Sequence, residues 1–165
     1  MFALMALFGT SKERKYLRKF ENAILYFSKN CEKVGKLKLA KLLYFMDFNH
    51  YEQFLEPITW SRYDHIKNGP VPENFYTVFN SMRDSKAIIV ENIPTTHENE
   101  FEKIIPNKEP NLGIFTKNEL STIKAIVDKF KYFNAEQMKE AVQKDYPCKI
   151  TKIGENIPYQ LALHR

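Results

Sequence analysis

A chain of 165 residues and 19.5 kDa has the size of one compact domain and is long enough to bury a hydrophobic core. Hydrophobic residues make up 44% of the chain and aromatic residues 14%, a composition that excludes an intrinsically disordered protein. The net charge of +5 is moderately basic, which permits an acidic partner or a nucleic acid but requires neither.

The chain begins with the apolar segment MFALMALF. Eight residues are too few to span a membrane, and the segment has neither a preceding basic region nor a small-residue cleavage site of the usual kind. We therefore expect residues 1–9 to form an apolar arm that covers a groove on this chain or on a second copy, as in a homodimer, and residues 10–165 to form the domain. Cys31 and Cys148 are too few for a disulfide framework, which favours a cytoplasmic protein without a membrane partner.

Thr10 and Glu13 have the spacing of a capping box, so a helix is predicted from there to about residue 30. Its apolar positions recur three and four residues apart, which makes the helix amphipathic. Basic residues cluster at its start, namely Lys12, Arg14, Lys15, Arg18 and Lys19. Of these, Lys12, Lys15, Arg18 and Lys19 are expected largely on the solvent side, so that the basic residues form a face.

The segment after Gly35, KLKLAKLLYFMDFNHYEQF, has apolar residues over most of the helical circumference. This pattern predicts a central helix that is buried on more than one side. Pro57 ends the helix. The next stretch, ITWSRYDHI at residues 58–66, is β-branched and aromatic with rough alternation, which predicts a short strand.

The stretch NGPVP contains Gly69, Pro70, Val71 and Pro72. Pro70 excludes Gly69 from helical backbone angles, and Pro72 is tolerated in the first turn of a helix. We therefore expect the prolines to stop the strand, a helix to follow over about residues 73–84, and the motif to be a rigid corner. Such a corner is either purely structural or holds its neighbours rigidly for a partner. The neighbours expected to gather there are Trp60, Tyr63, Lys67 and Tyr76.

The second half of the chain predicts an antiparallel hairpin from AIIVENI and EFEKIIP, and two helices over residues 117–130 and 135–145. Capping boxes open both helices, at Thr116 with Glu119 and at Asn134 with Gln137. Pro147 closes the helix pair, and an extended tail with a turn at Gly154 is expected to follow. The predicted fold is mainly α with a small antiparallel β element (α+β), in a single compact domain.

Asp47 and His50 lie three residues apart on the central helix, which is the minimum spacing for an acid–base pair or for two metal ligands. No third ligand has a metal-binding spacing to them, and Cys148 has no sequence context of a nucleophile. With five glycines, the chain has neither a phosphate loop nor a dinucleotide fingerprint. We therefore predict no catalytic residue, no metal and no cofactor, and give Asp47 and His50 a structural or interface role.

The helix pair over 117–145 also permits a helix-turn-helix reading, in which the second helix enters the major groove of DNA. Glu136, Glu140 and Asp145 would then face the phosphates, so this nucleic-acid-binding regulator is the less favoured alternative.

Two blocks of the chain form a pattern that is found in a known family. The first contains KLLYFMD, with Lys41 and Asp47 at its ends, and then the GPVP motif at residues 69–72. The second is GENIPY, from Gly154 to Tyr159. Together, these blocks resemble the Panacea domain of SocA-like antitoxins. The chain departs from the family pattern in QKDYPCK, where many members carry a histidine and a tryptophan and this chain has Lys144 and Cys148.

The resemblance implies the antitoxin of a type II toxin–antitoxin system, often found in mobile elements or prophages, which neutralises a cognate protein toxin by direct binding. In some branches it implies an adaptor for a protease of the AAA+ class. The residues expected to contact the toxin are Arg14, Arg18, Lys41, Asp47, His50, Trp60, Tyr63, Lys67 and Tyr76.

Overall fold

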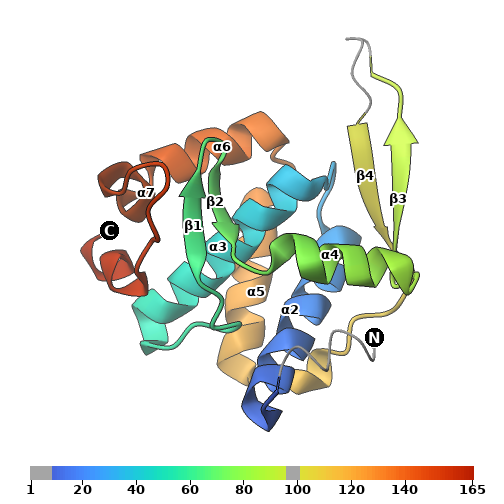
Figure 1. Ribbon diagram of the computed structural model, residues 1–165, viewed down its shortest axis with the longest axis horizontal. Coiled ribbons are helices and arrows are strands. Elements are labelled where there is room, and N and C mark those ends of the chain that lie inside the picture. The colour runs from blue at the N-terminus through green and yellow to red at the C-terminus, as the bar shows by residue number, and fades with distance from the viewer. Residues whose placement is uncertain (1–8, 96–100) are drawn as a thin grey trace.

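The computed structural model describes residues 9–95 and 101–165 of the chain (Figure 1). The apolar arm predicted for residues 1–9 lies outside the described residues except for Gly9. Two antiparallel two-stranded sheets accompany a set of helices, which confirms the predicted fold class, mainly α with a small β component. The elements are α2 (Ser11–Asn30), α3 (Lys36–Phe54), β1 (Tyr63–Ile66), β2 (Gly69–Pro72), α4 (Phe75–Asp84), β3 (Ile88–Ile93), β4 (Phe101–Pro106), the 3-10 helix η1 (Leu112–Ile114), α5 (Lys117–Phe130), α6 (Ala135–Lys144), α7 (Tyr146–Ile150) and the 3-10 helix η2 (Tyr159–His164).

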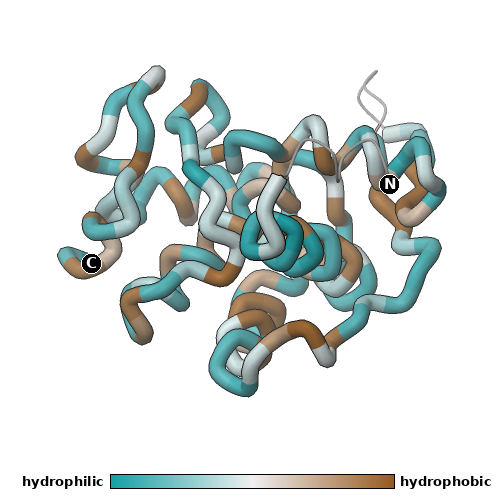
Figure 2. The backbone as a smooth tube through the Cα atoms, turned by 60° about the horizontal axis from the view of Figure 1, so that its bottom comes forward, coloured by the Kyte–Doolittle hydropathy of each residue, from teal (hydrophilic) through white to brown (hydrophobic). Residues whose placement is uncertain are grey.

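Helix α3 is the centre of the core, as its apolar circumference predicts. It packs against α2, α5, α6, β2 and η2. Leu39, Leu42, Leu43, Met46 and Phe48 are all fully buried along it. Around α3 the helices are amphipathic, and Figure 2 shows hydrophobic and hydrophilic residues alternating along them. None of the described helices is long and apolar enough to cross a membrane.

The three predicted capping boxes are confirmed. Thr10 opens α2 by accepting a hydrogen bond from the backbone N–H of Glu13, whose carboxylate accepts one from the backbone N–H of Thr10. The same reciprocal pair of hydrogen bonds opens α5 at Thr116 and α6 at Asn134. Each box satisfies backbone donors that the first turn of a helix otherwise leaves unpaired.

Lys19 does not lie on the solvent side of α2, and that prediction was wrong. Its side chain is buried, with 3% of the residue exposed, and Nζ lies 2.6 Å from Oε1 of Glu119 on α5. One helical turn further on, Ala23 is fully buried, so this side of α2 faces α5 rather than water. The ion pair neutralises a lysine that would otherwise be too costly to bury.

The prediction for NGPVP was wrong in its local structure. Residues 58–62 are not a strand, and Gly69–Pro72 form a strand of their own, β2, which pairs with β1 in the register Tyr63↔Pro72 to Ile66↔Gly69. Pro72 therefore does not start a helix, and α4 begins at Phe75. Pro70 and Pro72 are tolerated because they lie two residues apart in β2 and therefore have the same orientation toward β1. In an antiparallel ladder the N–H groups of residues 70 and 72 point away from the partner strand, so β1 loses no hydrogen bond.

The end of the chain also differs from the extended tail that was predicted. Pro147 lies in the first turn of a short helix, α7. After the turn at Gly154, residues 154–157 run along the outer edge of β1, where His65 N donates to Glu155 O and Ile157 N donates to Tyr63 O. The chain then forms η2 against α3. This edge pairing hydrogen-bonds the side of β1 that faces away from β2.

The predicted hairpin is confirmed as β3 and β4, in the register Ile88↔Pro106 to Ile93↔Phe101. Figure 1 shows the hairpin extending away from the helices, and the end of the hairpin where β3 begins lies beside α4. Ile104 N donates to Val34 O, and this hydrogen bond joins β4 to the link between α2 and α3.

Candidate functional site

The predicted contact residues fall into a buried group and an exposed group. Lys41, Asp47, His50 and Tyr63 are buried in the core, so their side chains are not available to a partner in this conformation. The structure thereby corrects their predicted role as contacts. The residues that remain on the surface are Arg14, Arg18, Trp60, Lys67 and Tyr76.

Asp47 is the centre of a buried hydrogen-bond network. Its residue is 0% exposed, and its carboxylate accepts hydrogen bonds from Ile58 N and Thr59 N at 2.8 Å, from Thr59 Oγ1 at 2.5 Å and from Tyr63 Oη at 2.7 Å. Burial raises the pKa of Asp47, and the four hydrogen bonds oppose that rise. A carboxylate on α3 thus fixes the backbone of the segment that follows Pro57.

His50 does not pair with Asp47. Its Nδ1 lies 2.5 Å from the carbonyl oxygen of Glu56, which only accepts, so Nδ1 carries the proton in this contact. The described residues contain no cluster of three or more metal-ligating side chains. The two residues act separately, each fixing a different part of the segment after α3.

Trp60 follows this fixed segment and has an unusual backbone conformation. Its φ is 56°, in the left-handed region that a bulky side chain rarely adopts. Thr59 is held by Asp47 on one side of it, and on the other side Tyr159 Oη donates to Ser61 O at 2.5 Å. The conformation is therefore imposed by hydrogen bonds on both sides, as is common where a fold holds a side chain for function.

Trp60 is 47% exposed, and its indole lies against α2. Its ring centroid is 6.1 Å from that of Tyr16, and Lys12 Nζ is 5.8 Å from the Trp60 ring and 5.9 Å from the Tyr16 ring. A lysine at this distance is attracted by both ring faces. Trp60 and Tyr63 do not gather at one corner as predicted, because the Tyr63 ring packs inward on Tyr44 and Phe48.

A groove of about 270 Å³ opens beside Trp60. It lies between the first turns of α2, the segment after Pro57 and the start of α4. Its lining contains both apolar and polar residues and consists of Lys12, Glu13, Tyr16, Leu17, Phe20, Thr59, Trp60, Ser61, Asn74 and Val78.

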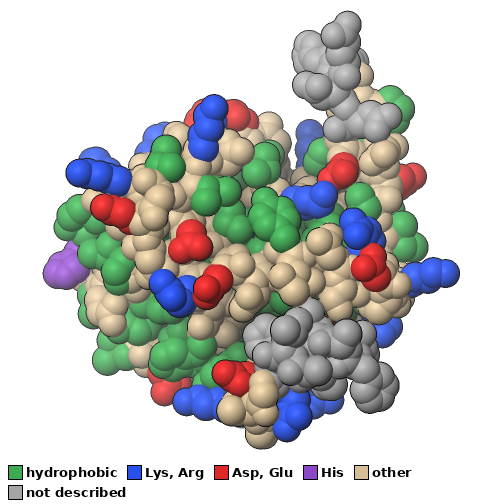
Figure 3. Space-filling model, viewed as in Figure 1, with side chains coloured by type: hydrophobic (Ala, Val, Ile, Leu, Met, Phe, Trp, Pro, Cys, Tyr) green, Lys and Arg blue, Asp and Glu red, His purple; other side chains and the backbone are tan. Residues whose placement is uncertain are grey.

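A band of cations continues from the groove around α2. We call Lys12, Arg14, Lys15 and Arg18 the basic ridge; all four are exposed. Arg14, Lys15 and Arg18 line a second, shallow hollow beside Ile114. In Figure 3, Lys and Arg side chains lie along the lower edge of the molecule, where α2 begins in Figure 1. Among the described residues, no ion pair involves a member of the ridge.

The two positions that depart from the family pattern differ in environment. Lys144 is exposed at the last residue of α6, whereas Cys148 is buried in α7. Burial raises the pKa of Cys148 to about 12, so its thiol stays protonated at neutral pH and is a poor nucleophile.

Sequence reasoning missed three members of this site. Lys12 and Tyr16 belong to a different element from Trp60, and the contact between Thr59 and Asp47 links residues that no short motif connects. The available signal was the placement of a tryptophan between two hydroxyl residues directly after Pro57.

The family model described as "Antitoxin SocA-like, Panacea domain" matches residues 39–147. The match covers more than half of the chain and includes Asp47, Trp60 and the hairpin of β1 and β2, while α2 precedes it. Comparison with curated proteins and with solved structures gives no significant match. By this match over α3 to the first turn of α7, the chain belongs to the family of SocA-like antitoxins with a Panacea domain.

Proposed function

We propose that this chain is an antitoxin that neutralises a cognate protein toxin by direct protein–protein binding, with Trp60 as the central contact. The observation that carries the proposal is that Trp60 is exposed while the buried hydrogen-bond network of Asp47 holds the backbone of Trp60 at a positive φ. Family membership supports the antitoxin class.

The backbone conformation of Trp60 indicates that a tryptophan occupies this position for binding rather than for folding. A non-glycine residue in the left-handed region carries a strain of about 1–3 kcal/mol, which a glycine there would avoid. Tryptophan is enriched among the residues that dominate binding energy at protein interfaces. A side chain that is already held in place loses little conformational entropy when the partner arrives.

The proposal includes two routes to neutralisation in the cytoplasm. In the first, the bound chain masks the toxin and leaves its amount unchanged. In the second, it acts as an adaptor and delivers the toxin to a AAA+ protease, which shortens the lifetime of the toxin. Following the toxin level after protein synthesis is stopped, with and without this chain, separates the two routes.

Co-expression with the products of the neighbouring genes tests the proposal. We expect the wild-type chain to rescue growth from one toxic neighbour and to co-purify with it, and Trp60→Ala to lose both effects. Tyr132→Ala is the matched control, because Tyr132 is an aromatic residue with 68% exposure in the link between α5 and α6, and this variant should rescue growth. If no neighbouring product is toxic, or if Trp60→Ala binds the toxin as tightly as the wild type, the proposal is wrong.

The helix pair formed by α5 and α6 does not favour the alternative function, which is binding of nucleic acid. Met138 and Val142 pack into the core, so the outer side of α6 carries Glu136 and Glu140 together with Lys144. This mixed charge is unfavourable beside a phosphate backbone.

A further inference from the structure

We infer that the surface of the toxin that meets this chain is acidic and inserts one apolar side chain into the groove beside Trp60. The inference rests on the proposed function and names the chemistry of the partner. It follows from the charge of the basic ridge, from the size and lining of the groove, and from the position of Lys12 between the two.

The cations of the basic ridge form no ion pair among the described residues, whereas the other lysines of α2 are paired. Arg18 lies near Glu21 on the same helix, and its charge favours the ionised form of that carboxyl. Further along α2, Lys19 pairs with Glu119, and Lys29 pairs with Glu109. Glu13, the acid next to the ridge, accepts the backbone N–H of Thr10 in the capping box, and its negative charge offsets one of the four cations, so the ridge remains net positive. The four cations of the ridge therefore present positive charge to the solvent.

Folding does not explain this arrangement. Arg14 and Arg18 lie four residues apart on one helix, and like charges at this spacing repel each other. Lys12 and Arg14 also lie in the first turn of α2, where the helix dipole is unfavourable for cations. Both effects oppose the helix, and contact with an acidic surface would relieve both.

The groove beside Trp60 suits a single side chain. Its volume of about 270 Å³ leaves room for an apolar side chain of a partner. Leu17, Phe20 and Val78 supply apolar lining in addition to the two aromatic rings. An apolar side chain that enters this space removes water from the exposed part of Trp60, which is the usual setting of a dominant contact.

Lys12 joins the ridge to the groove. Its Nζ lies over the rings of Trp60 and Tyr16, yet the residue remains exposed. A carboxylate of the partner that pairs with Lys12 would place its neighbouring residues over the groove. This position favours a protein in which acidic residues flank an apolar one.

The same features argue against nucleic acid as the occupant. The rings of Tyr16 and Trp60 already contact each other at an angle of 42°, so they do not form two free parallel faces for stacked bases.

Association kinetics with the neutralised toxin, measured by surface plasmon resonance, test the inference. Charge complementarity accelerates encounter and is screened by salt, so the association rate constant of the wild type should fall about tenfold between about 50 and about 500 mM NaCl. Lys15→Glu/Arg18→Glu should lower that constant about tenfold at low salt and leave the dissociation rate constant within about twofold. Trp60→Ala should show the opposite pattern, with faster dissociation.

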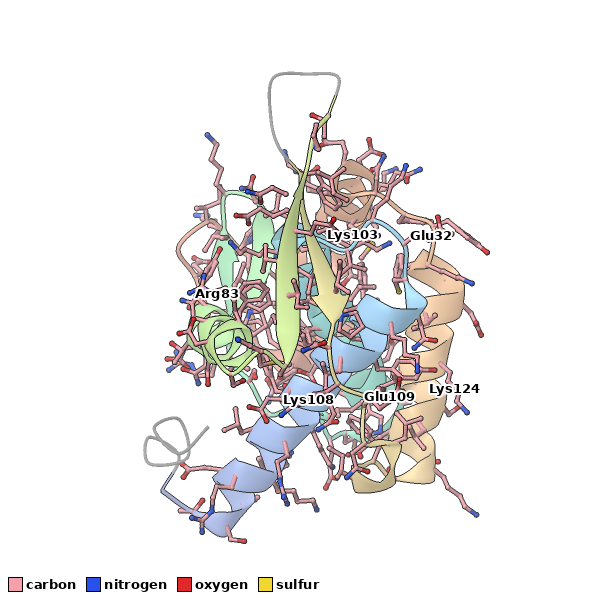
Figure 4. All side chains as sticks on the ribbon, turned by 90° about the vertical axis from the view of Figure 1, so that its right-hand side faces the viewer. Glu32, Arg83, Lys103, Lys108, Glu109 and Lys124 are labelled. Carbon is pink, nitrogen blue, oxygen red and sulfur yellow. The ribbon has the colours of Figure 1, made fainter. Side chains whose placement is uncertain are left out.

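Lys124→Glu/Lys152→Glu is the matched control, because it changes the net charge equally at two exposed lysines outside the ridge. Figure 4 shows Lys124 pointing outward from α5, on the side away from α2. This variant should keep the association rate constant within about twofold of the wild type. The salt dependence of the wild type tests the inference even if a ridge variant does not fold.

Three results would overturn the inference. A toxin that is neutralised and bound at a salt-independent rate leaves the proposed function standing and removes the acidic partner surface. Labelled duplex DNA that binds the wild type but not the ridge variant, with toxin binding unchanged, assigns the ridge to nucleic acid. If no neighbouring product is bound at all, the proposed function fails first and the inference fails with it.

Discussion

Lys41 Nζ lies 3.0 Å from the carbonyl oxygen of Pro70, in a buried contact that joins α3 to β2. A lysine of the KLLYFMD motif therefore connects the GPVP motif to the central helix, so two segments that carry the resemblance to the family meet in space. Gly69 lies directly against the same lysine, since a Cβ at residue 69 would come within 3.1 Å of Lys41 Cε. This contact makes the motif a structural joint.

The stability of Lys41→Met should depend less on pH in the alkaline range than the stability of the wild type does. Burial lowers the pKa of Lys41 from 10.5 to about 8, so between these values the unfolded chain binds the proton that the folded chain has released. The stability of the wild type relative to Lys41→Met should therefore rise, by about 2 kcal/mol, as the pH increases from about 7 to about 10.

Urea denaturation of both proteins across this pH range measures the effect. Cys148, whose charge would favour the protonated form of Lys41, has a pKa raised to about 12 and stays protonated throughout. A stability difference that is flat with pH would show that the Lys41 amine is not desolvated in the folded protein.

Gly69→Ala and Gly154→Ala should separate backbone strain from crowding. Both glycines have a φ of 95°, which disfavours any residue with a Cβ. At residue 69 the new methyl group would also meet Lys41 and Val142 at 3.1 Å, whereas nothing lies within 4 Å at residue 154. We expect a loss of about 1 kcal/mol for Gly154→Ala and of about 2–3 kcal/mol for Gly69→Ala in thermal or urea unfolding. Equal losses would mean that the packing around Gly69 relaxes freely.

Asp47→Asn should keep the fold, and Asp47→Ala should weaken it by about 3 kcal/mol or more. An asparagine oxygen can still accept the N–H groups of Ile58 and Thr59, while its amide donates to the hydroxyls of Thr59 and Tyr63, which also accept. Alanine leaves these groups without a partner in the core. Similar stability for the two variants in urea would contradict the role of Asp47 as the centre of the network.

The stability difference between the wild type and Asp47→Asn should change with pH in a defined direction. Burial raises the pKa of Asp47 above 3.8, so the folded protein takes up this proton at a higher pH than the unfolded chain. The contribution of Asp47 to stability is therefore largest at low pH and decreases as the pH rises through the raised pKa. Asp47→Asn should therefore gain stability relative to the wild type as the pH rises above about 4, as urea denaturation of both proteins at several pH values would measure.

Local interactions explain which parts of the fold were predictable. The capping box of Thr10 and Glu13 links residues three positions apart, and the apolar circumference of α3 can be read from a single helix. The ion pair between Lys19 and Glu119 joins residues 100 positions apart, so sequence periodicity assigned Lys19 to the solvent. The prolines of β2 were wrongly predicted to stop the strand for a related reason. Whether a strand tolerates them depends on which N–H groups face β1.

The candidate site was predictable only in part. Trp60 and Arg18 were singled out from the sequence, and the structure leaves both on the surface. The contact of Trp60 with Tyr16 depends on how α2 packs, and the positive φ of Trp60 depends on the buried carboxylate of Asp47. Neither fact is encoded in a short motif, so sequence reasoning assigned Asp47 a structural or interface role without connecting it to Trp60.

The ion pair of Lys19 and Glu119 should behave as a coupled buried unit. Lys19→Met leaves a buried carboxylate without its partner and should cost about 3 kcal/mol. Lys19→Met/Glu119→Gln should recover at least half of this loss, because the glutamine side chain can still accept the backbone N–H of Thr116. A double-mutant cycle from urea denaturation measures the coupling. Additive losses would show that the pair is solvated.

Trp60→Gly and Trp60→Ala should reverse the usual stability order of the two small residues. Glycine ordinarily destabilises a folded chain by about 0.5–1 kcal/mol relative to alanine, but at a φ of 56° the Cβ of alanine is strained and glycine is not. We expect Trp60→Gly to be the more stable variant by about 1 kcal/mol in urea denaturation.

At Tyr132, whose φ is not positive, the same two substitutions should follow the ordinary order and serve as the control. Both Trp60 variants should lose about 2 kcal/mol or more of toxin binding, because both lack the indole. A Trp60→Gly variant that is more stable and binds less tightly would show that the strain at this residue is retained for binding. If Trp60→Ala is instead the more stable variant, the hydrogen bonds of Asp47 and Tyr159 do not hold residue 60 in the left-handed region, and the rigid presentation of Trp60 has to be abandoned.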